Sequence, residues 1–187
     1  MLTFYYSTMN AAKTAFLLAS SHNYRERGMN VCMLNSSLDT RSGFGKIVSR
    51  IGIESSAFSF DGNENLLLYL ESQSPQTLSC VFVDEAQFLT PEQVFQLAQF
   101  CDKYSIPVNC FGLRTDFKGK TFPGSNALLG IADTLTEIKT NCFCGKNATM
   151  CVRMDDGVVV KEGQQIKVGG NVEYQTFCRK HWFEKIV

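Results

Sequence analysis

The sequence lacks an excess of either charge. Lysine and arginine together number 18, as do aspartate and glutamate, so the formal net charge is zero. Proteins that hold a nucleic-acid backbone use a field of basic residues, so we expect no nucleic-acid polymer among the partners. No apolar run is long enough to span a membrane, and the first motif begins at residue 7, which leaves no room for a signal peptide. We therefore expect a cytoplasmic protein with no membrane partner.

Without a secretion signal, the eight cysteines are expected to be reduced thiols or metal ligands rather than a disulfide framework. Cys151 lies in a strand pattern, where we expect it to serve packing. Three others stand with a histidine in two short pairs, Cys142-Phe-Cys144 and Cys178-Arg-Lys-His181. Three sulfurs and one imidazole make a tetrahedral structural zinc set, filled by protein alone. The alternative is four groups that share no site. The remaining cysteines lie in apolar runs and are expected to be buried: Cys32, Cys80, Cys101 and Cys110.

A phosphate-binding pattern is present without its glycines. After the apolar run Leu2–Tyr6, residues 7–14 read Ser7, Thr8, Met9, Asn10, Ala11, Ala12, Lys13 and Thr14. The pattern Gly-x-x-x-x-Gly-Lys-[Ser/Thr] has glycine where Ser7 and Ala12 stand here. Lys13 supplies a point charge for phosphate, the Thr14 hydroxyl a magnesium ligand, and backbone amides at the helix start an anion site. The alternative is an ordinary strand-to-helix turn.

A second motif decides between these alternatives. Residues 80–88 begin with the apolar run Cys80–Val83, which is followed at once by two carboxylates, Asp84 and Glu85. A fully apolar strand is typical of a parallel sheet covered on both faces, and ligands bind beyond the carboxyl ends of such strands. Asp84 is therefore predicted to help hold magnesium beside Thr14, and Glu85 to face the group that receives the phosphate. Taken without the Lys13-Thr14 pair, Asp84 and Glu85 could instead be two solvated carboxylates at the end of a strand.

The order of apolar runs predicts an α/β fold, with a mostly parallel sheet and helices on both faces. A helix is expected over Lys13–Arg27 and another from Thr90, with Val94, Phe95, Leu97 and Ala98 at helical spacing. Glycine-rich residues 42–46 form either a lid or a long loop. Near residue 141 the composition changes, and a hairpin is expected to turn at residues 155–157. We therefore expect two domains, 1–140 and 141–187. The predicted strands are Leu2–Tyr6, Val31–Leu34, Cys80–Val83, Val108–Phe111 and Leu135–Ile138.

Taken in this order, the motifs resemble those of the type II thymidine kinases, which join a P-loop NTPase-like domain to a zinc-stapled lasso domain. The resemblance covers nearly the whole chain. It is closest to the gamma-proteobacterial branch, in which Tyr-Tyr-Ser-x-Met-Asn-Ala precedes the lysine and Arg-Thr-Asp-Phe follows a later strand.

The resemblance implies a role for each matching residue. Glu85 corresponds to the proton acceptor for the 5′-hydroxyl, and Asp39-Thr40-Arg41 to an element that helps hold magnesium and the transferred phosphate. Ala86 and Gln87 extend the ATP-binding set. The residues that match the thymine pocket and the lasso are Met9, Phe88, Phe117, Phe122, Lys167, Val168, Gly169, Gly170 and Tyr174.

The resemblance also implies the ligands and the assembly. We expect phosphoryl transfer from ATP to thymidine with magnesium, feedback inhibition by dTTP, structural zinc and a homotetramer. Ala12 departs from the family, which places glycine there because the backbone passes close to phosphate. We expect weakened ATP binding. The alternatives are a catalytically silent relative that binds thymidine or dTTP, and a zinc-ribbon module that binds nucleic acid, which the neutral charge disfavours.

Overall fold

The computed structural model describes residues 1–41, 43–166 and 173–186, and within them the largest sheet is parallel. Its six strands are hydrogen-bonded in the order β5-β2-β6-β7-β1-β8, and each neighbouring pair is parallel. The α/β prediction is confirmed, since all five predicted strands are present, and β5 is an additional strand. The strands are β1 (Leu2–Ser7), β2 (Asn30–Ser36), β5 (Phe58–Phe60), β6 (Leu78–Val83), β7 (Val108–Leu113) and β8 (Thr134–Glu137).

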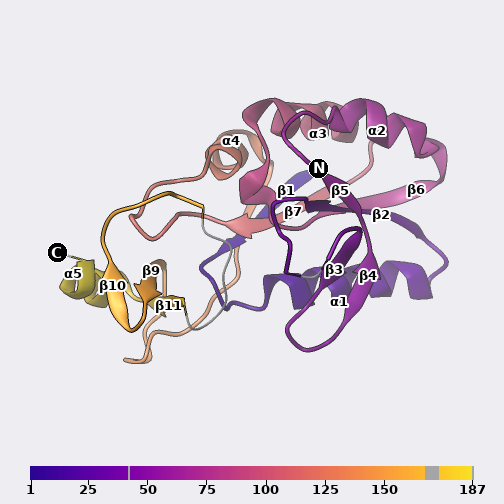
Figure 1. The fold of residues 1–187 in the computed structure, drawn as a ribbon. Coiled ribbons are helices and arrows are strands. Elements are labelled where there is room, and N and C mark those ends of the chain that lie inside the picture. The colour runs from indigo at the N-terminus through magenta and orange to yellow at the C-terminus, as the bar shows by residue number, and fades with distance from the viewer. Residues whose placement is uncertain (42, 167–172, 187) are drawn as a thin grey trace.

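Helices cover both faces of this sheet (Figure 1). Helix α1 (Lys13–Glu26) lies on one face, while α2 (Leu66–Ser72), α3 (Pro91–Tyr104) and α4 (Pro123–Ile131) lie on the other. Side chains of β6 alternate between the two cores. Val81 and Val83 pack with α2 and α3, whereas Phe82 packs with Leu17 of α1. Burial on both faces therefore explains why this strand has no polar alternation.

Helix α3 begins as its sequence predicts. Thr90 caps it, the Thr90 hydroxyl accepts from the Gln93 amide at 3.2 Å, and Pro91 occupies the first turn. Val94 and Leu97 are fully buried. Phe95 is half exposed, although its neighbours follow the expected helical spacing. One position along a helix rotates a side chain by about 100°, which carries Phe95 past the edge of the buried stripe.

A smaller antiparallel sheet follows the main one. It has the order β10-β9-β11 and consists of β9 (Met150–Asp155), β10 (Val158–Val160) and β11 (Tyr174–Phe177), with helix α5 (Arg179–Ile186) beside it. The β9–β10 hairpin turns at the predicted place, where Asp156 and Gly157 both have positive φ. We call residues 141–166 and 173–186 the C-terminal lobe.

The single tryptophan joins this lobe to the main body. The indole Nε1 of Trp182 donates to the carbonyl oxygens of Phe117, at 3.1 Å, and Cys151, at 3.0 Å. Its ring packs with Val152 and Phe177 in the core of the lobe. One side chain in α5 therefore holds both β9 and the loop that follows β7.

The glycine-rich segment leads into a hairpin that the sequence analysis did not predict. Strands β3 (Lys46–Val48) and β4 (Glu54–Ser56) pair antiparallel next to α1 (Figure 1). Ile47 is 1% exposed and belongs to the core beneath α1. Residue 42, the first residue of the predicted lid or loop, lies outside the described ranges. Two short 3-10 turns complete the elements, η1 (Pro75–Thr77) and η2 (Ala86–Phe88).

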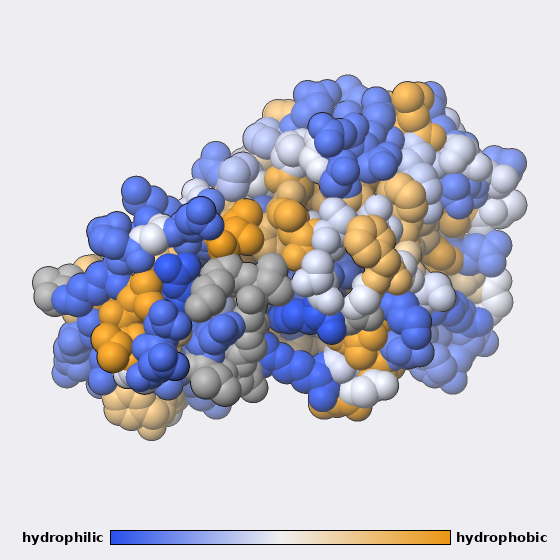
Figure 2. Space-filling model, viewed as in Figure 1, coloured by the Kyte–Doolittle hydropathy of each residue, from blue (hydrophilic) through white to orange (hydrophobic). Residues whose placement is uncertain are grey.

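The surface is mixed in polarity. Figure 2 shows hydrophilic residues over α3 and hydrophobic residues around β10, where Val158 is exposed. In the described ranges, no helix combines the length and the apolar character needed to cross a bilayer.

Turn η2 lies against the first turn of α4 because of one glycine. A β-carbon on Gly124 would lie 2.6 Å from the carbonyl oxygens of both Ala86 and Leu89. Backbone atoms cannot yield cheaply to such a contact, so we expect Gly124→Ala to destabilise the fold by roughly 1–3 kcal/mol. The free energy of unfolding in urea measures this change.

The matched control lies on the same helix. A β-carbon on Gly130 meets nothing within 4 Å, so Gly130→Ala is expected to be neutral or to stabilise by up to about 1 kcal/mol. Equal effects of the two alanines would contradict the close approach at Gly124.

Candidate active site

Lys13 opens helix α1 and is held by the loop before it. Its Nζ donates to Ser7 Oγ at 2.9 Å and to the Thr8 carbonyl at 2.8 Å. The side chain is buried, and this burial lowers the pKa of Lys13, while the nearby carboxylates of Glu85 and Asp84 act to raise it. The cation is thus fixed at the carboxyl edge of the sheet.

The loop backbone turns through the left-handed region twice. Asn10 has φ 62° and Ala12 has φ 57°, and the Ala12 carbonyl accepts from the Phe16 amide at 3.0 Å. Glycine adopts this region without a steric penalty, whereas alanine pays about 1–2 kcal/mol. The conformation at residue 12 therefore gives a physical reason for the glycine of the phosphate-binding pattern.

Asp84 lies at the end of β6, close to the start of α1. It is 3% exposed, and burial together with the charge of Glu85 raises the pKa of Asp84 to about 7. A hydrogen bond from the Thr14 side chain and one from the Glu85 amide act in the opposite direction. Two oxygen ligands therefore lie together where the predicted magnesium would bind, and a cation there would offset the cost of the buried carboxylate.

Glu85 is oriented from both sides. Its carboxylate accepts from Arg41 Nη2 at 2.6 Å and from the side-chain amide of Gln87. Asp39 holds Arg41 through Nε at 2.6 Å and raises the pKa of Arg41, and Gln87 in turn accepts from the Leu113 amide at 3.0 Å. Glu85 itself has φ 50°, a third strained residue in this region. Three side chains, those of Arg41, Gln87 and Asp39, thus fix the direction of a single carboxylate.

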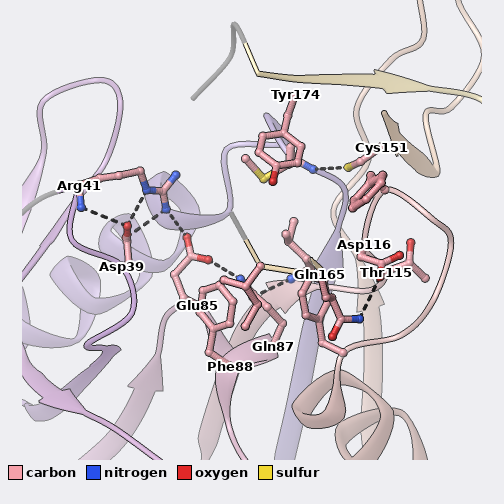
Figure 3. Close-up of a pocket in the computed structure, with 15 residues that line it drawn as sticks. Asp39, Arg41, Glu85, Gln87, Phe88, Thr115, Asp116, Cys151, Gln165 and Tyr174 are labelled. Carbon is pink, nitrogen blue, oxygen red and sulfur yellow. Dashed lines mark hydrogen bonds and ion pairs between the residues drawn. The ribbon is translucent and has the colours of Figure 1, made fainter. Parts of the chain in front are cut away.

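Two adjoining cavities meet at this carboxylate. The larger has a volume of about 590 Å³ and is lined by the phosphate loop, Asp84 and the β3–β4 hairpin. The smaller, of about 50 Å³, is mainly apolar. Both are lined by Arg41 and Glu85 as well as by Met9 and Asp39. Figure 3 shows Arg41 and Glu85 on one side of the smaller cavity and Tyr174 and Cys151 on another. This junction suits transfer of a group between two bound molecules.

Aromatic rings form the walls of the smaller cavity. The rings of Phe88 and Phe122 meet edge to face, with centroids 6.1 Å apart. Phe117 is 1% exposed, and the guanidinium of Arg153 lies 4.2 Å from its ring centroid. These rings are therefore supported in place, which favours a flat ligand.

The structure brings most predicted site residues to these cavities. Ser7 and Thr8 support Lys13, and Ala86 is buried against α4, so none of these three lines either cavity in the described part of the chain. Lys167, Val168, Gly169 and Gly170 lie outside the described residues. The larger cavity is lined by Met9, Asn10, Ala11, Ala12, Lys13, Thr14, Asp39, Arg41, Asp84 and Glu85, and the smaller by Met9, Gln87, Phe88, Phe117, Phe122 and Tyr174, among others.

Several lining residues of the smaller cavity were not predicted as site residues, among them Cys151, Gln165 and Asp116. Cys151 packs in β9 as expected, but its Sγ also accepts from the Met9 amide at 3.3 Å, which links the C-terminal lobe to the phosphate loop. Gln165 donates to Asp116 Oδ2 at 3.0 Å. The Arg-Thr-Asp-Phe motif could have indicated Asp116, whereas no sequence signal marks Cys151 or Gln165.

The predicted metal ligands come together in the C-terminal lobe. The ligand atoms of Cys142, Cys144, Cys178 and His181 all lie within 4.8 Å of one another. A tetrahedral zinc with Zn–S bonds of about 2.3 Å holds two sulfurs roughly 3.8 Å apart, and sulfur and nitrogen roughly 3.5 Å apart. The sulfurs of Cys144 and Cys178 are 3.9 Å apart, and His181 Nδ1 lies 3.3 Å from Cys142 Sγ.

The electrostatics of the cluster also suit zinc. Desolvation acts to raise the pKa of Cys142, but hydrogen bonds from the backbone and from His181 lower it to about 6. A thiolate is the form that binds metal. The residues present therefore fit a structural zinc.

A buried lysine, a loop before a helix and an Asp-Glu pair at one edge of a parallel sheet are the parts of a P-loop phosphotransferase. The family model described as "Thymidine kinase" matches residues 1–182. The chain therefore belongs to the thymidine kinase family, and the resemblance drawn from its motifs is confirmed.

Individual relatives agree with this assignment. A thymidine kinase of Rhodopirellula baltica is 55% identical over 187 residues, which cover 99% of this chain and 89% of the relative. One of Shewanella oneidensis is 54% identical, with 99% and 97% covered. One of Salmonella typhimurium is 51% identical, with 97% and 89% covered.

The exposed ligand Cys144 offers the cleanest test of the metal. We expect one zinc per chain by elemental analysis, and loss of that zinc in Cys144→Ser. Because Cys144 is exposed, the change removes little packing, so a loss of several kcal/mol of stability (about 3 or more) would report the metal. Trp182 fluorescence follows unfolding of the lobe. If removal of metal from the parent protein left its free energy of unfolding unchanged, a structural zinc would be contradicted.

Restoring glycine at position 12 tests the strain in the loop. Ala12→Gly is expected to raise the free energy of unfolding by up to about 1 kcal/mol, because glycine accepts φ 57° freely. It is also expected to lower KM for ATP and leave KM for thymidine unchanged, since the β-carbon that the variant removes would lie beside the phosphates and away from the nucleoside. Denaturation and steady-state kinetics measure the two effects. A variant that changes neither would show that alanine is already relaxed there.

Proposed function

We propose that this protein transfers the γ-phosphate of ATP to the 5′-hydroxyl of thymidine, giving dTMP and ADP. The observation that carries the proposal is the place of Glu85, at the junction of a polar and an aromatic cavity and oriented by Arg41 and Gln87. In this scheme the polar cavity takes the triphosphate and the aromatic one takes the nucleoside. The 5′-hydroxyl would then face both Glu85 and the γ-phosphate.

Residues of this chain can serve each step of the reaction. Glu85 accepts the hydroxyl proton as the 5′-oxygen attacks the γ-phosphorus, and the bond to the β-phosphate oxygen breaks as ADP leaves. Lys13 and Arg41 neutralise charge on the phosphates, together with the loop amides. Thr14 and Asp84 would hold magnesium, which neutralises charge on the β- and γ-phosphates when bound.

The aromatic cavity supports thymidine as the acceptor. A thymine ring is flat and largely apolar, which matches walls made by Phe88, Phe117 and Phe122. Close packing around the 5-methyl group is a source of specificity. We propose that Tyr174 and the backbone of residues 167–170 complete this site by reading the edge of the base.

The remaining family properties are part of the same proposal. Because the two cavities meet, one dTTP molecule could place its base in the aromatic cavity and its phosphates in the polar one, which supports feedback inhibition by dTTP. Residues 1–140 would form the ATP-binding domain and residues 141–187 the lasso domain. We also propose a cytoplasmic homotetramer, on the family resemblance. A silent relative is disfavoured because Lys13, Thr14 and Glu85 are all present.

The proton acceptor gives the sharpest test of this function. Glu85→Gln keeps the shape of the side chain and can still accept from Arg41, but it cannot accept a proton. We expect kcat to fall roughly 10²–10⁴-fold while the dissociation constants of thymidine and ATP change little. A coupled assay with ATP, magnesium and thymidine measures kcat, and calorimetry measures binding. A kcat equal to that of the parent would show that Glu85 is not the proton acceptor.

A further inference from the structure

The β3–β4 hairpin forms part of the wall of the larger cavity. Residues Ile47 to Ile51 line it together with the phosphate loop. The hairpin is anchored at several points: Ile47 is buried in the core beneath α1, Asn35 donates to the Lys46 carbonyl at 3.2 Å, and Arg25 of α1 donates to Ser55 Oγ at 3.0 Å. The wall is therefore fixed to the main body at its base.

The tip of the hairpin is a tight turn. The Ser49 amide donates to the Ile53 carbonyl at 2.8 Å, and the Ile53 amide donates to Ser49 Oγ at 3.1 Å. The Gly52 amide donates to the Ser49 carbonyl at 3.0 Å, and Gly52 has φ 83°. These bonds hold Arg50, inside the turn, at the cavity.

The guanidinium of Arg50 crosses to the phosphate loop. It donates to the side-chain oxygen of Asn10, one of the loop residues with positive φ. Burial and the positive charge of Arg41 lower the pKa of Arg50, while Glu85 raises it. Arg50 therefore lies within electrostatic range of the two residues at the junction of the cavities. Since arginine stays charged, a polyanion in the cavity would relieve this repulsion between cations.

From this placement we propose that Arg50 is a third cationic contact of the ATP polyphosphate chain, beside Lys13 and Arg41, and that it exchanges Asn10 for phosphate oxygens when nucleotide binds. Its forked guanidinium is suited to phosphate. The proposal rests on the proposed function in one respect, that the larger cavity takes the nucleotide. The hairpin then acts as the second half of the nucleotide site, opposite the loop.

The test compares two variants, each of which removes one positive charge from the hairpin. Arg50→Gln removes the cation that lines the cavity. Lys46→Gln removes a cation that pairs with Glu54 on the exposed side and does not line it. We expect Arg50→Gln to raise the dissociation constants of ATP with magnesium and of inorganic tripolyphosphate roughly 10- to 100-fold, as for a lost hydrogen bond to a charged group. Arg50→Lys should fall between this variant and the parent.

Two further readouts separate a phosphate contact from a structural role. The dissociation constant of thymidine should change by less than about twofold in Arg50→Gln, because the aromatic cavity is untouched, and Lys46→Gln should match the parent throughout. Equal tripolyphosphate binding by Arg50→Gln and Lys46→Gln would overturn the proposal, as would parallel losses for thymidine and ATP. A parent that binds ATP without phosphorylating thymidine would refute the proposed function alone, and the binding constants would still decide the role of Arg50.

Discussion

Lys13 and Asp84, an amine and a carboxyl group, are both buried at the carboxyl edge of the main sheet. Charges removed from water must be compensated by nearby polar groups, or they unfold the region that holds them. The compensation comes from several elements at once: Ser7 from the end of β1, Thr14 from α1 and Glu85 from beyond β6. The order of the sheet, the left-handed turns of the loop and the direction of Glu85 can all be understood as ways to keep these groups together.

The C-terminal lobe contributes to the same site through two contacts. Cys151 accepts a hydrogen bond from the Met9 amide, and Trp182 binds the loop that carries Phe117. The ligands that fit zinc come from the loop before β9, from Cys178 directly after β11 and from His181 in the first turn of α5. A metal there would therefore stiffen the wall of the aromatic cavity as well as the lobe, which has only a small core of its own.

Motifs with strict chemistry were readable from the sequence. The Lys13-Thr14 pair, the Asp84-Glu85 strand end and the Cys3His set occupy the expected places, and the five predicted strands lie in one sheet. The short strands β3, β4 and β5 were missed because three residues are too few for periodicity to register. The second role of Cys151 depends on tertiary packing of β9 against the loop, which leaves no trace in local sequence. Phe95 shows the same limit, because the edge of a buried helical stripe is set by neighbouring elements.

Strand β1 lies between β7 and β8, so Leu2 pairs with Val108 and Thr3 with Thr134. During synthesis the first residues leave the ribosome long before either partner does. The phosphate loop directly follows β1, and its shape depends on where that strand is fixed. A chain interrupted before β7 therefore has no means of holding the loop, and nucleotide could assist folding only after most of the main sheet has been translated. Truncated products would depend on chaperones rather than on ligand for their protection.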